Sequence, residues 1–288
     1  MAYPRGSGAA PPLVEGPKMA GLASKYRGDR ECDLFECLWM QRETAAPQSS
    51  CLGKPDEVDL AGLLALPGVK EECVLRSHVG FMALHGGSQD RGTDQIARRA
   101  ARQSGSSYYA IVQPSEMRVH LTSRLHNPDH SAHLRSFLEH VDIAISVHGF
   151  GRDAFALWLD PDQGLIVEPY GPAIRGRQTG PLRGIIVGGR NAQLLDAARE
   201  LLDERFDGYH VADERVRLGF HPDNPVNLPS SQGVQIEFPP GLRGIGEYGE
   251  TLIPSQDKMV NEVVTALVEL ASRAGKILSS TLGPGARG

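Results

Sequence analysis

Along most of the chain, short apolar runs alternate with amphipathic stretches. The apolar runs have the length and composition of buried strands; they are Phe81–Leu84, Tyr108–Val112, Val141–Val147, Phe155–Leu159, Gly184–Val187 and Val234–Phe238. The amphipathic stretches have helical spacing; they are Asp59–Leu66, Asp94–Gln103, His130–His140, Gln193–Arg205 and Asp257–Arg273. This alternation predicts an α/β fold with a mixed, mostly parallel sheet flanked by helices on both faces.

Residues that favour helix ends support two of these helices. Asp59 is an acidic cap at the start of the first helix, which Pro67 would end. Thr93 is placed to cap the helix Asp94–Gln103, and Gly105 is placed to stop it. We therefore expect both helices to begin and end close to these residues.

Residues 1–55 lack this alternation. Residues 1–25 are rich in Gly, Pro, Ala and Ser, which is typical of a partly disordered segment, and residues 30–40 hold a short apolar cluster that can dock on a neighbour. We expect an N-terminal extension over residues 1–55 and a single folded domain, which would carry the chemistry, over residues 56–288.

Composition narrows the functional class. The 288-residue chain has a formal net charge of -5 and a pI near 6.1, so no general attraction to nucleic acid or an anionic membrane surface is expected. It has no apolar run of the roughly 20 residues that span a bilayer, and it begins without the apolar stretch of a secretory signal. We expect a cytoplasmic protein, and the oligomeric state stays open.

All the cysteines lie early in the chain, at Cys32, Cys37, Cys51 and Cys73. Only the first two are close together, so the two close pairs of a four-cysteine zinc site are missing. Reduced thiols fit a cytoplasmic protein, and a disulfide within the N-terminal segment is the alternative.

Reactive side chains stand at the ends of three predicted strands. His85, His148 and Glu237 each end a separate apolar run, and Asp90 lies on the glycine-bearing loop after His85. The carboxyl ends of strands are where an α/β sheet gathers its site, so we expect these side chains to lie close together. A lone histidine at a strand end is more often a structural hydrogen-bonding group, but two of them with two carboxylates favour a metal site.

Two histidines and one carboxylate leave a ligand position open, as in catalytic zinc sites. Zn²⁺ held by His85, Asp90 and His148 would produce a water nucleophile for a carbonyl group. Glu237 is then the candidate general base that takes the proton and passes it to the leaving nitrogen. Asp94 is an alternative ligand, although a carboxylate in the first turn of a helix is common without any metal.

Three motifs around these residues follow one another along the chain. They are Leu84-His85-Gly86-Gly87 with the acid at position 90 and Gly92-Thr93, then Ser146-Val147-His148-Gly149, and finally Gly233-Val234-Gln235-Ile236-Glu237. Together they resemble the zinc-dependent poly-γ-glutamate hydrolase family. The resemblance covers roughly Leu66 to Gly244. It implies a carboxypeptidase-A-like α/β fold, ligand histidines at His85 and His148, and a catalytic glutamate at Glu237. Asp90 stands where the family usually has a glutamate, so the loop is expected to come closer to the metal.

Arginines behind the strand ends are candidates for binding a substrate carboxylate or a developing oxyanion. Arg190 follows the run Gly184–Val187 through two glycines, and Arg152 and Arg243 lie shortly after His148 and Glu237. Each of them alone is more often an ordinary solvated or ion-paired surface residue. Other polar residues are expected to line the site without an assigned role; they are His120, His126 and the loop His221–Asn227, whose Pro, Asp and Asn also suit a turn.

The sequence thus predicts a zinc-dependent hydrolase of the peptidase or amidase type. Its substrate would be a small or polymeric amide, anionic in character, cut at a γ-glutamyl or peptide-like bond. Two alternatives stay open, a non-catalytic metal-binding or peptide-binding protein on the same scaffold and a small-molecule deacylase. Glu237 argues against a pure binding protein, which has no need of a buried base at a strand end.

Overall fold

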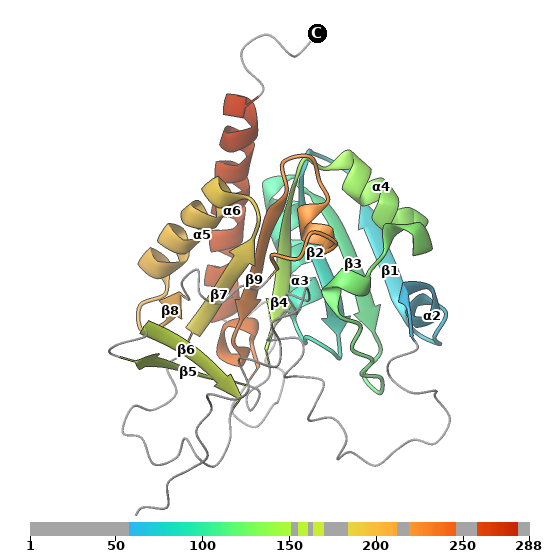
Figure 1. Ribbon diagram of the computed structural model, residues 1–288, viewed down its shortest axis with the longest axis horizontal. Coiled ribbons are helices and arrows are strands. Elements are labelled where there is room, and N and C mark those ends of the chain that lie inside the picture. Colours follow the sequence, from blue (N-terminus) through green and yellow to red (C-terminus); the bar gives the residue numbers. More distant parts are fainter. Residues whose placement is uncertain are drawn as a thin grey trace, which may run out of the picture. The chain divides into compact units, whose positions relative to one another are not determined.

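The structure, a computed structural model, describes residues 58–150, 155–160, 164–169, 184–211, 219–245 and 258–281. Within these residues, seven strands form one mixed sheet in the order β1-β3-β2-β4-β9-β7-β8 (Figure 1). Their bounds are β1 Lys70–Val74, β2 Val79–Gly87, β3 Ser107–Gln113, β4 Ile143–Gly149, β7 Gly184–Gly189, β8 His210–Val211 and β9 Gly233–Phe238. The strands β5 Phe155–Asp160 and β6 Gly164–Pro169 pair with each other in a separate hairpin.

The middle of the sheet is parallel and its flanks are mixed. Strands β3, β2, β4 and β9 run parallel to one another, so the carboxyl ends of β2, β4 and β9 meet at the same edge. By contrast, β1 pairs antiparallel with β3, and β7 pairs antiparallel with β9. The short strand β8 pairs parallel with β7.

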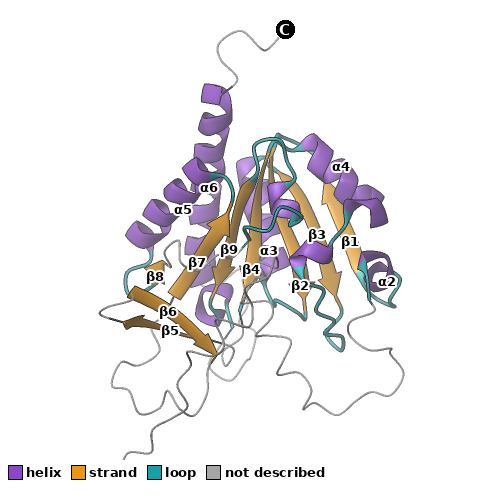
Figure 2. Cartoon of the chain, viewed as in Figure 1, coloured by secondary structure: helices purple, strands orange, loops and turns teal. Residues whose placement is uncertain are grey.

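Helices cover both faces of the sheet (Figure 2). Helices α3 Thr93–Ser104, α5 Ala192–Arg205 and α6 Lys258–Thr281 share one apolar cluster with one face, and α2 Leu60–Leu64 and α4 Ala132–His140 share a second cluster with the other. Side chains that alternate along a strand point to opposite faces. Accordingly, Phe81 and Ala83 of β2 belong to the first cluster, and Met82 and Leu84 to the second. The predicted fold class is confirmed.

The helix ends confirm most of the predicted caps. Asp59 caps α2 by accepting a hydrogen bond of 2.8 Å from the Gly62 N–H, and Gly105 ends α3 in the left-handed conformation. The prediction for Thr93 is wrong, because the N-cap of α3 is Gly92. Thr93 is the first helical residue, and its hydroxyl donates to the carbonyl oxygen of Asp90 at 2.7 Å.

Several strands and one helix differ from the predicted ranges. Strands β2 and β4 extend to glycines, so His85 and His148 lie inside the strands instead of after them. Helix α6 continues to Thr281, and the edge strands β1 and β8 went unpredicted because one is polar and the other is two residues long. No described helix has the length and apolarity needed to cross a membrane.

Two predictions concern residues outside the described ranges. The N-terminal extension over residues 1–55 and three of the cysteines fall there; these are Cys32, Cys37 and Cys51. Cys73 lies in the described part, where it forms no disulfide, and its thiol donates to the His133 carbonyl oxygen at 3.7 Å.

Candidate metal centre

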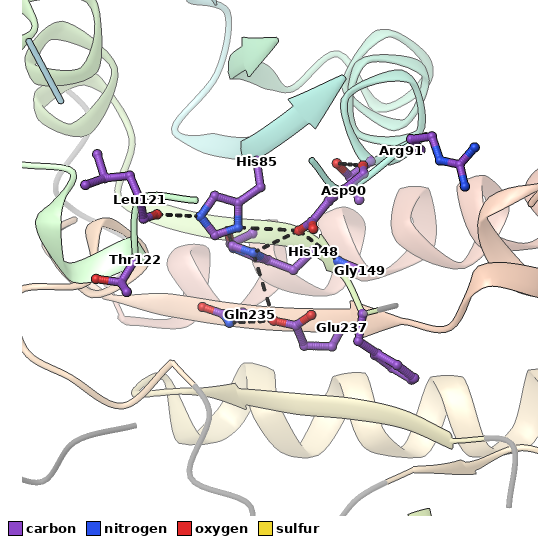
Figure 3. Close-up of polar contacts among 12 residues, drawn as sticks. His85, Asp90, Arg91, Leu121, Thr122, His148, Gly149, Gln235 and Glu237 are labelled. Carbon is purple, nitrogen blue, oxygen red and sulfur yellow. Dashed lines mark hydrogen bonds and ion pairs between the residues drawn. The ribbon is translucent and has the colours of Figure 1, made fainter. Parts of the chain in front are cut away.

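His85 is oriented by a carbonyl group on the segment that follows β3. It is buried near the end of β2, where the pairing register with β3 shifts between Ala83 and Gly86. A bulge of this kind re-aims a side chain beside a site. The His85 Nε2 lies 2.9 Å from the carbonyl oxygen of Leu121 (Figure 3). Because a carbonyl oxygen only accepts hydrogen bonds, Nε2 carries a hydrogen, so Nδ1 is the nitrogen through which the neutral tautomer would bind a metal.

Asp90 is brought to His85 by a tight loop. The Asp90 N–H donates to the His85 carbonyl oxygen at 2.7 Å, which folds the chain back on the strand. The loop leaves β2 through Gly87, whose φ is 76° and whose added Cβ would lie 2.1 Å from the Gln113 carbonyl oxygen. Only glycine fits there. The Asp90 Oδ2 then lies 3.4 Å from the His85 Nδ1 and accepts from the Gly149 N–H at 3.2 Å.

His148 completes the cluster from β4. Its Nδ1 lies 3.7 Å from the Asp90 Oδ2, and its Nε2 lies 2.8 Å from the Ser146 Oγ. His148 is 2% exposed, and Glu237 is a further polar neighbour of its Nδ1. Like His85, His148 turns Nδ1 to the carboxylate, and its other nitrogen lies within hydrogen-bonding distance of a protein oxygen, which is how ligand histidines are oriented.

The three side chains suit a zinc ion. Among the described residues they form a group whose ligand atoms all lie within 4.8 Å of one another. Donor atoms of a tetrahedral zinc ion lie roughly 3.3–3.6 Å apart, which matches the separations of 3.4 Å and 3.7 Å from Asp90 to the two histidines. Burial alone would raise the pKa of Asp90, but hydrogen bonds with His148 and His85 hold it well below its usual range. The carboxylate is therefore ionised, as a metal ligand must be.

Glu237 faces this cluster from the neighbouring strand. It pairs in register with His148, and its Oε1 lies 3.9 Å from the His148 Nδ1. The Gln235 Nε2 donates to the same Oε1 at 2.9 Å, and the Asn224 Nδ2 donates to the Gln235 Oε1 at 3.0 Å. Burial raises the pKa of Glu237, while His148 opposes this shift. A carboxylate with a raised pKa is suited to accept a proton near neutral pH.

Two further histidines stand beside His85, and the sequence left both without a role. The ring centroid of His120 lies 5.0 Å from that of His85, and the centroid of His126 lies 5.6 Å away. His126 is fully buried; its Nδ1 lies 3.2 Å from the Thr122 carbonyl oxygen, and its Nε2 has no hydrogen-bond partner among the described residues. Burial lowers the pKa of His120 to about 3 and that of His126 well below its usual value, so both rings are neutral.

The structure does not bring Arg190 to the cluster. We expected Arg190 to point into the site from the end of its strand, but β7 runs antiparallel to β9. Ile186 pairs with Glu237, whereas the Arg190 N–H donates to the carbonyl oxygen of Gly233 at 3.1 Å, at the start of β9. Four residues of strand separate Gly233 from Glu237, which is about 13 Å. The exposed side chain of Arg190 therefore belongs to the other end of the sheet.

None of the remaining candidates that the structure describes joins the cluster of His85, Asp90 and His148. Arg152 lies outside the described residues. Arg243 is buried, and its guanidinium donates to three backbone carbonyl oxygens. Asp94 is not part of the cluster; its Oδ1 accepts from the Gly87 N–H at 3.1 Å in the first turn of α3. The loop His221–Asn227 shows the predicted turn chemistry, with Asn224 capping a 3₁₀ turn, and also supplies the contact to Gln235.

Comparisons with known proteins agree with this fold. Residues 66–158, which include His85, Asp90 and His148 but not Glu237, match the family profile "Poly-gamma-glutamate hydrolase". The predicted resemblance is thus confirmed over that part of the chain. A sequence search of curated proteins gave no match.

Three solved structures resemble the chain. A bacteriophage poly-gamma-glutamate hydrolase is 20% identical with a TM-score of 0.53, over 73% of this chain and 90% of its own. YndL in a zinc-free form is 18% identical with a TM-score of 0.52, over 72% of this chain and 90% of its own. An N-formylglutamate amidohydrolase from Ralstonia eutropha JMP134 is 12% identical with a TM-score of 0.43, over 73% of this chain and 97% of its own. The first two likenesses show a shared fold.

Proposed function

We propose that the protein is a zinc-dependent amide hydrolase that cuts a γ-glutamyl or peptide-like bond. The observation that carries the proposal is the convergence of the His85 Nδ1, the His148 Nδ1 and the Asp90 Oδ2, with the Glu237 Oε1 3.9 Å from the nearer histidine. The family profile matched by the ligand-bearing residues, and the hydrolases that share the fold, support the hydrolase class.

The ligand roles follow from the contacts. His85, Asp90 and His148 would hold Zn²⁺, with the two histidines fixed from behind by the Leu121 carbonyl oxygen and the Ser146 hydroxyl. Zn²⁺ bound there would supply Lewis-acid chemistry, which makes a water molecule acidic enough to attack a carbonyl group at neutral pH.

Glu237 would carry the proton. Its carboxylate accepts a proton from the attacking water as the carbon–oxygen bond forms, and donates it to the amide nitrogen as the carbon–nitrogen bond breaks. Burial, which raises its pKa, favours the protonated form that the second step requires. Gln235 holds the Oε1 in place during both steps, because its amide donates to that oxygen and is itself held by Asn224.

The substrate class is proposed from the family resemblance. A γ-glutamyl polymer carries one free carboxylate per residue and is therefore anionic. Because β7 runs antiparallel to β9, Arg190 is no longer proposed as the substrate cation, and Arg152 keeps its proposed substrate role as the arginine that follows His148 and Gly149 along the chain. The buried carboxylate of Glu237 favours hydrolysis of an amide over binding alone. Burying a carboxylate costs free energy, and a protein that only binds has no need of one there.

The proposal is tested with full-length protein purified without chelator. We expect one equivalent of zinc by metal analysis and release of glutamate oligomers from poly-γ-glutamate; α-linked polyglutamate, tested beside it, distinguishes a γ-glutamyl from a peptide-like bond. Glu237→Gln should retain zinc and lose hydrolysis, whereas Glu139→Gln, an exposed glutamate on α4, should keep both. Protein without stoichiometric zinc, or full activity in Glu237→Gln, would contradict the proposal; retained zinc with no cleavage of any amide would identify a binding protein.

A further inference from the structure

Arg243 is a buried cation that the proposed chemistry leaves without a task. It ends the 3₁₀ helix Pro240–Arg243, which follows β9, and it is 4% exposed. All three guanidinium nitrogens donate to backbone carbonyl oxygens. The Nε lies 2.9 Å from the Phe238 oxygen, the Nη1 lies 2.7 Å from the Arg91 oxygen, and the Nη2 lies 2.7 Å from the Phe150 oxygen.

These three carbonyl groups belong to residues that follow Asp90, His148 and Glu237 by one or two positions in the sequence. Arg91 follows Asp90, and Phe238 follows Glu237. Phe150 is two residues beyond His148. One side chain thus binds the backbone of three segments that lie far apart in the sequence, and each segment carries either a ligand or the base.

Two glycines make room for Arg243, one for its guanidinium and one for its backbone. A Cβ on Gly149 would lie 2.3 Å from the Arg243 Cζ, so the backbone of β4 passes directly against the guanidinium. Gly92 has a φ of 88°, and its Cβ would lie 2.8 Å from the Arg243 carbonyl oxygen. The same Gly149 donates its N–H to the Asp90 Oδ2 at 3.2 Å, which connects the arginine to the ligand carboxylate through a single residue.

The charge of Arg243 is compensated inside the site. A buried cation is costly unless its donors are satisfied and opposite charge lies nearby. Burial lowers the pKa of Arg243, and the carboxylates of Asp90 and Glu237 oppose this shift. The guanidinium remains charged, because arginine does not lose its proton in proteins.

We propose that Arg243 is a positioning residue that sets the relative placement of Asp90, His148 and Glu237 and thereby the zinc affinity of the centre. The metal identity rests on the proposed function, and the geometric role rests on the three hydrogen bonds. A planar fork with donors in fixed directions can hold three carbonyl groups at once. A lysine ammonium keeps the charge but is a single point that cannot reach all three.

The test compares Arg243→Lys and Arg243→Met with wild-type protein. Zinc affinity is measured by competition with a chelator, and coordination by the visible spectrum of the Co²⁺-loaded protein. Both variants should bind zinc roughly 10–100-fold more weakly, as losses behind a metal ligand typically do, and both should change the Co²⁺ spectrum. Amide exchange of Gly149, followed by NMR in metal-free protein, should become at least about tenfold faster, because its bond to Asp90 loosens.

Arg205→Lys is the matched control. Arg205 lies on α5 and forms ion pairs of 3.4 Å and 3.0 Å with Glu262 and Glu269 of α6, so its replacement disturbs a cation remote from the site. It should leave zinc affinity, the Co²⁺ spectrum and Gly149 exchange unchanged, whatever it does to the melting temperature. If Arg243→Met does not fold, Gly149→Ala displaces the guanidinium without removing it and should weaken zinc binding in the same direction.

The outcomes separate this proposal from the proposed function. Wild-type zinc affinity and unchanged Gly149 exchange in Arg243→Lys would overturn the positioning role while leaving a zinc hydrolase intact. Wild-type protein that binds no zinc would overturn the proposed function, and the exchange rate of the Gly149 amide would then decide the positioning role by itself.

Discussion

His148 and Glu237 lie opposite each other on the parallel strands β4 and β9, with 3.9 Å between the His148 Nδ1 and the Glu237 Oε1. Their spacing is set by the register of the sheet and not by a loop. A slip of one residue between the strands would turn Glu237 to the opposite face, because side chains alternate along a strand. The distance from the proposed ligand His148 to the proposed base Glu237 is therefore as well defined as the pairing of the two strands.

The hydrogen bond from Gln235 to Glu237 predicts a loss of activity without a loss of metal. Gln235→Met keeps the length of the side chain but removes the donor that lies 2.9 Å from the Glu237 Oε1. A hydrogen bond to a charged group contributes roughly 1.5–3 kcal/mol, so we expect kcat/KM to fall by about 10–100-fold. Zinc content, measured on the same preparation, should stay at one equivalent; unchanged kinetics would show that Glu237 is held without Gln235.

Asp90 is the proposed ligand whose replacement should affect zinc binding most strongly. Asp90→Asn removes the negative charge that faces the His85 and His148 nitrogens at 3.4 Å and 3.7 Å. Zinc affinity should fall by more than the roughly 10–100-fold typical of an outer-shell loss. Asp90→Glu keeps the charge but lengthens the side chain by about 1.5 Å. Its zinc affinity should therefore lie between that of wild-type protein and that of Asp90→Asn.

A control for these variants is available at the far end of β4. Asp142 contacts His78 and Ser230 and is separated from His148 by most of the strand. Asp142→Asn should bind zinc as wild-type protein does in the same chelator competition. Wild-type affinity in Asp90→Asn would remove Asp90 from the ligand set.

Gly87 and Gly105 form a matched pair for the backbone of the loop. Both have positive φ, of 76° and 70°, but a Cβ on Gly87 would lie 2.1 Å from the Gln113 carbonyl oxygen, whereas nothing lies within 4 Å of one on Gly105. Gly105→Ala should cost about 1–2 kcal/mol for the left-handed conformation alone. Gly87→Ala must also move a strand, so its free energy of unfolding in urea should fall further and zinc binding should weaken. Equal costs for both substitutions would contradict the close contact with β3.

The neutral histidines beside the site predict a dependence of stability on pH. The pKa of His126 lies well below its usual value in the folded protein, and that of His120 is about 3, because both rings are buried. The unfolded chain binds protons at these histidines near pH 6.5 and the folded chain does not. Stability is therefore full above this pH and is lost as pH falls from about 6.5 towards the folded-state values.

His126→Gln isolates one of these contributions. Removing one such histidine should lower the slope of the free energy of unfolding by up to about 1.4 kcal/mol per pH unit in this window. Urea unfolding of metal-free protein at several pH values between about 4 and 7 measures the slope. Identical slopes in wild-type protein and His126→Gln would mean that the ring is protonated in the folded state.

The local pattern of the sequence determined most of the strands and helices and singled out the four residues of the candidate site. Apolar runs ending in His85, His148 and Glu237 specify buried strands with polar ends, and the glycines around Asp90 specify a tight loop. These signals are local, because burial and turn geometry depend on neighbouring residues. The carboxyl ends of parallel strands then meet wherever the sheet forms.

Tertiary structure alone decided the direction of β7, the role of Arg243 and the place of the two extra histidines. An apolar run has the same pattern in either strand direction, so only pairing with β9 shows that Arg190 is remote from Glu237. The partners of Arg243 are carbonyl groups at residues 91, 150 and 238, which the backbone of any sequence possesses. His120 and His126 reach His85 because the segment after β3 folds back against β2. Such contacts join residues far apart in the chain, and their energies depend on distances that only the folded molecule sets.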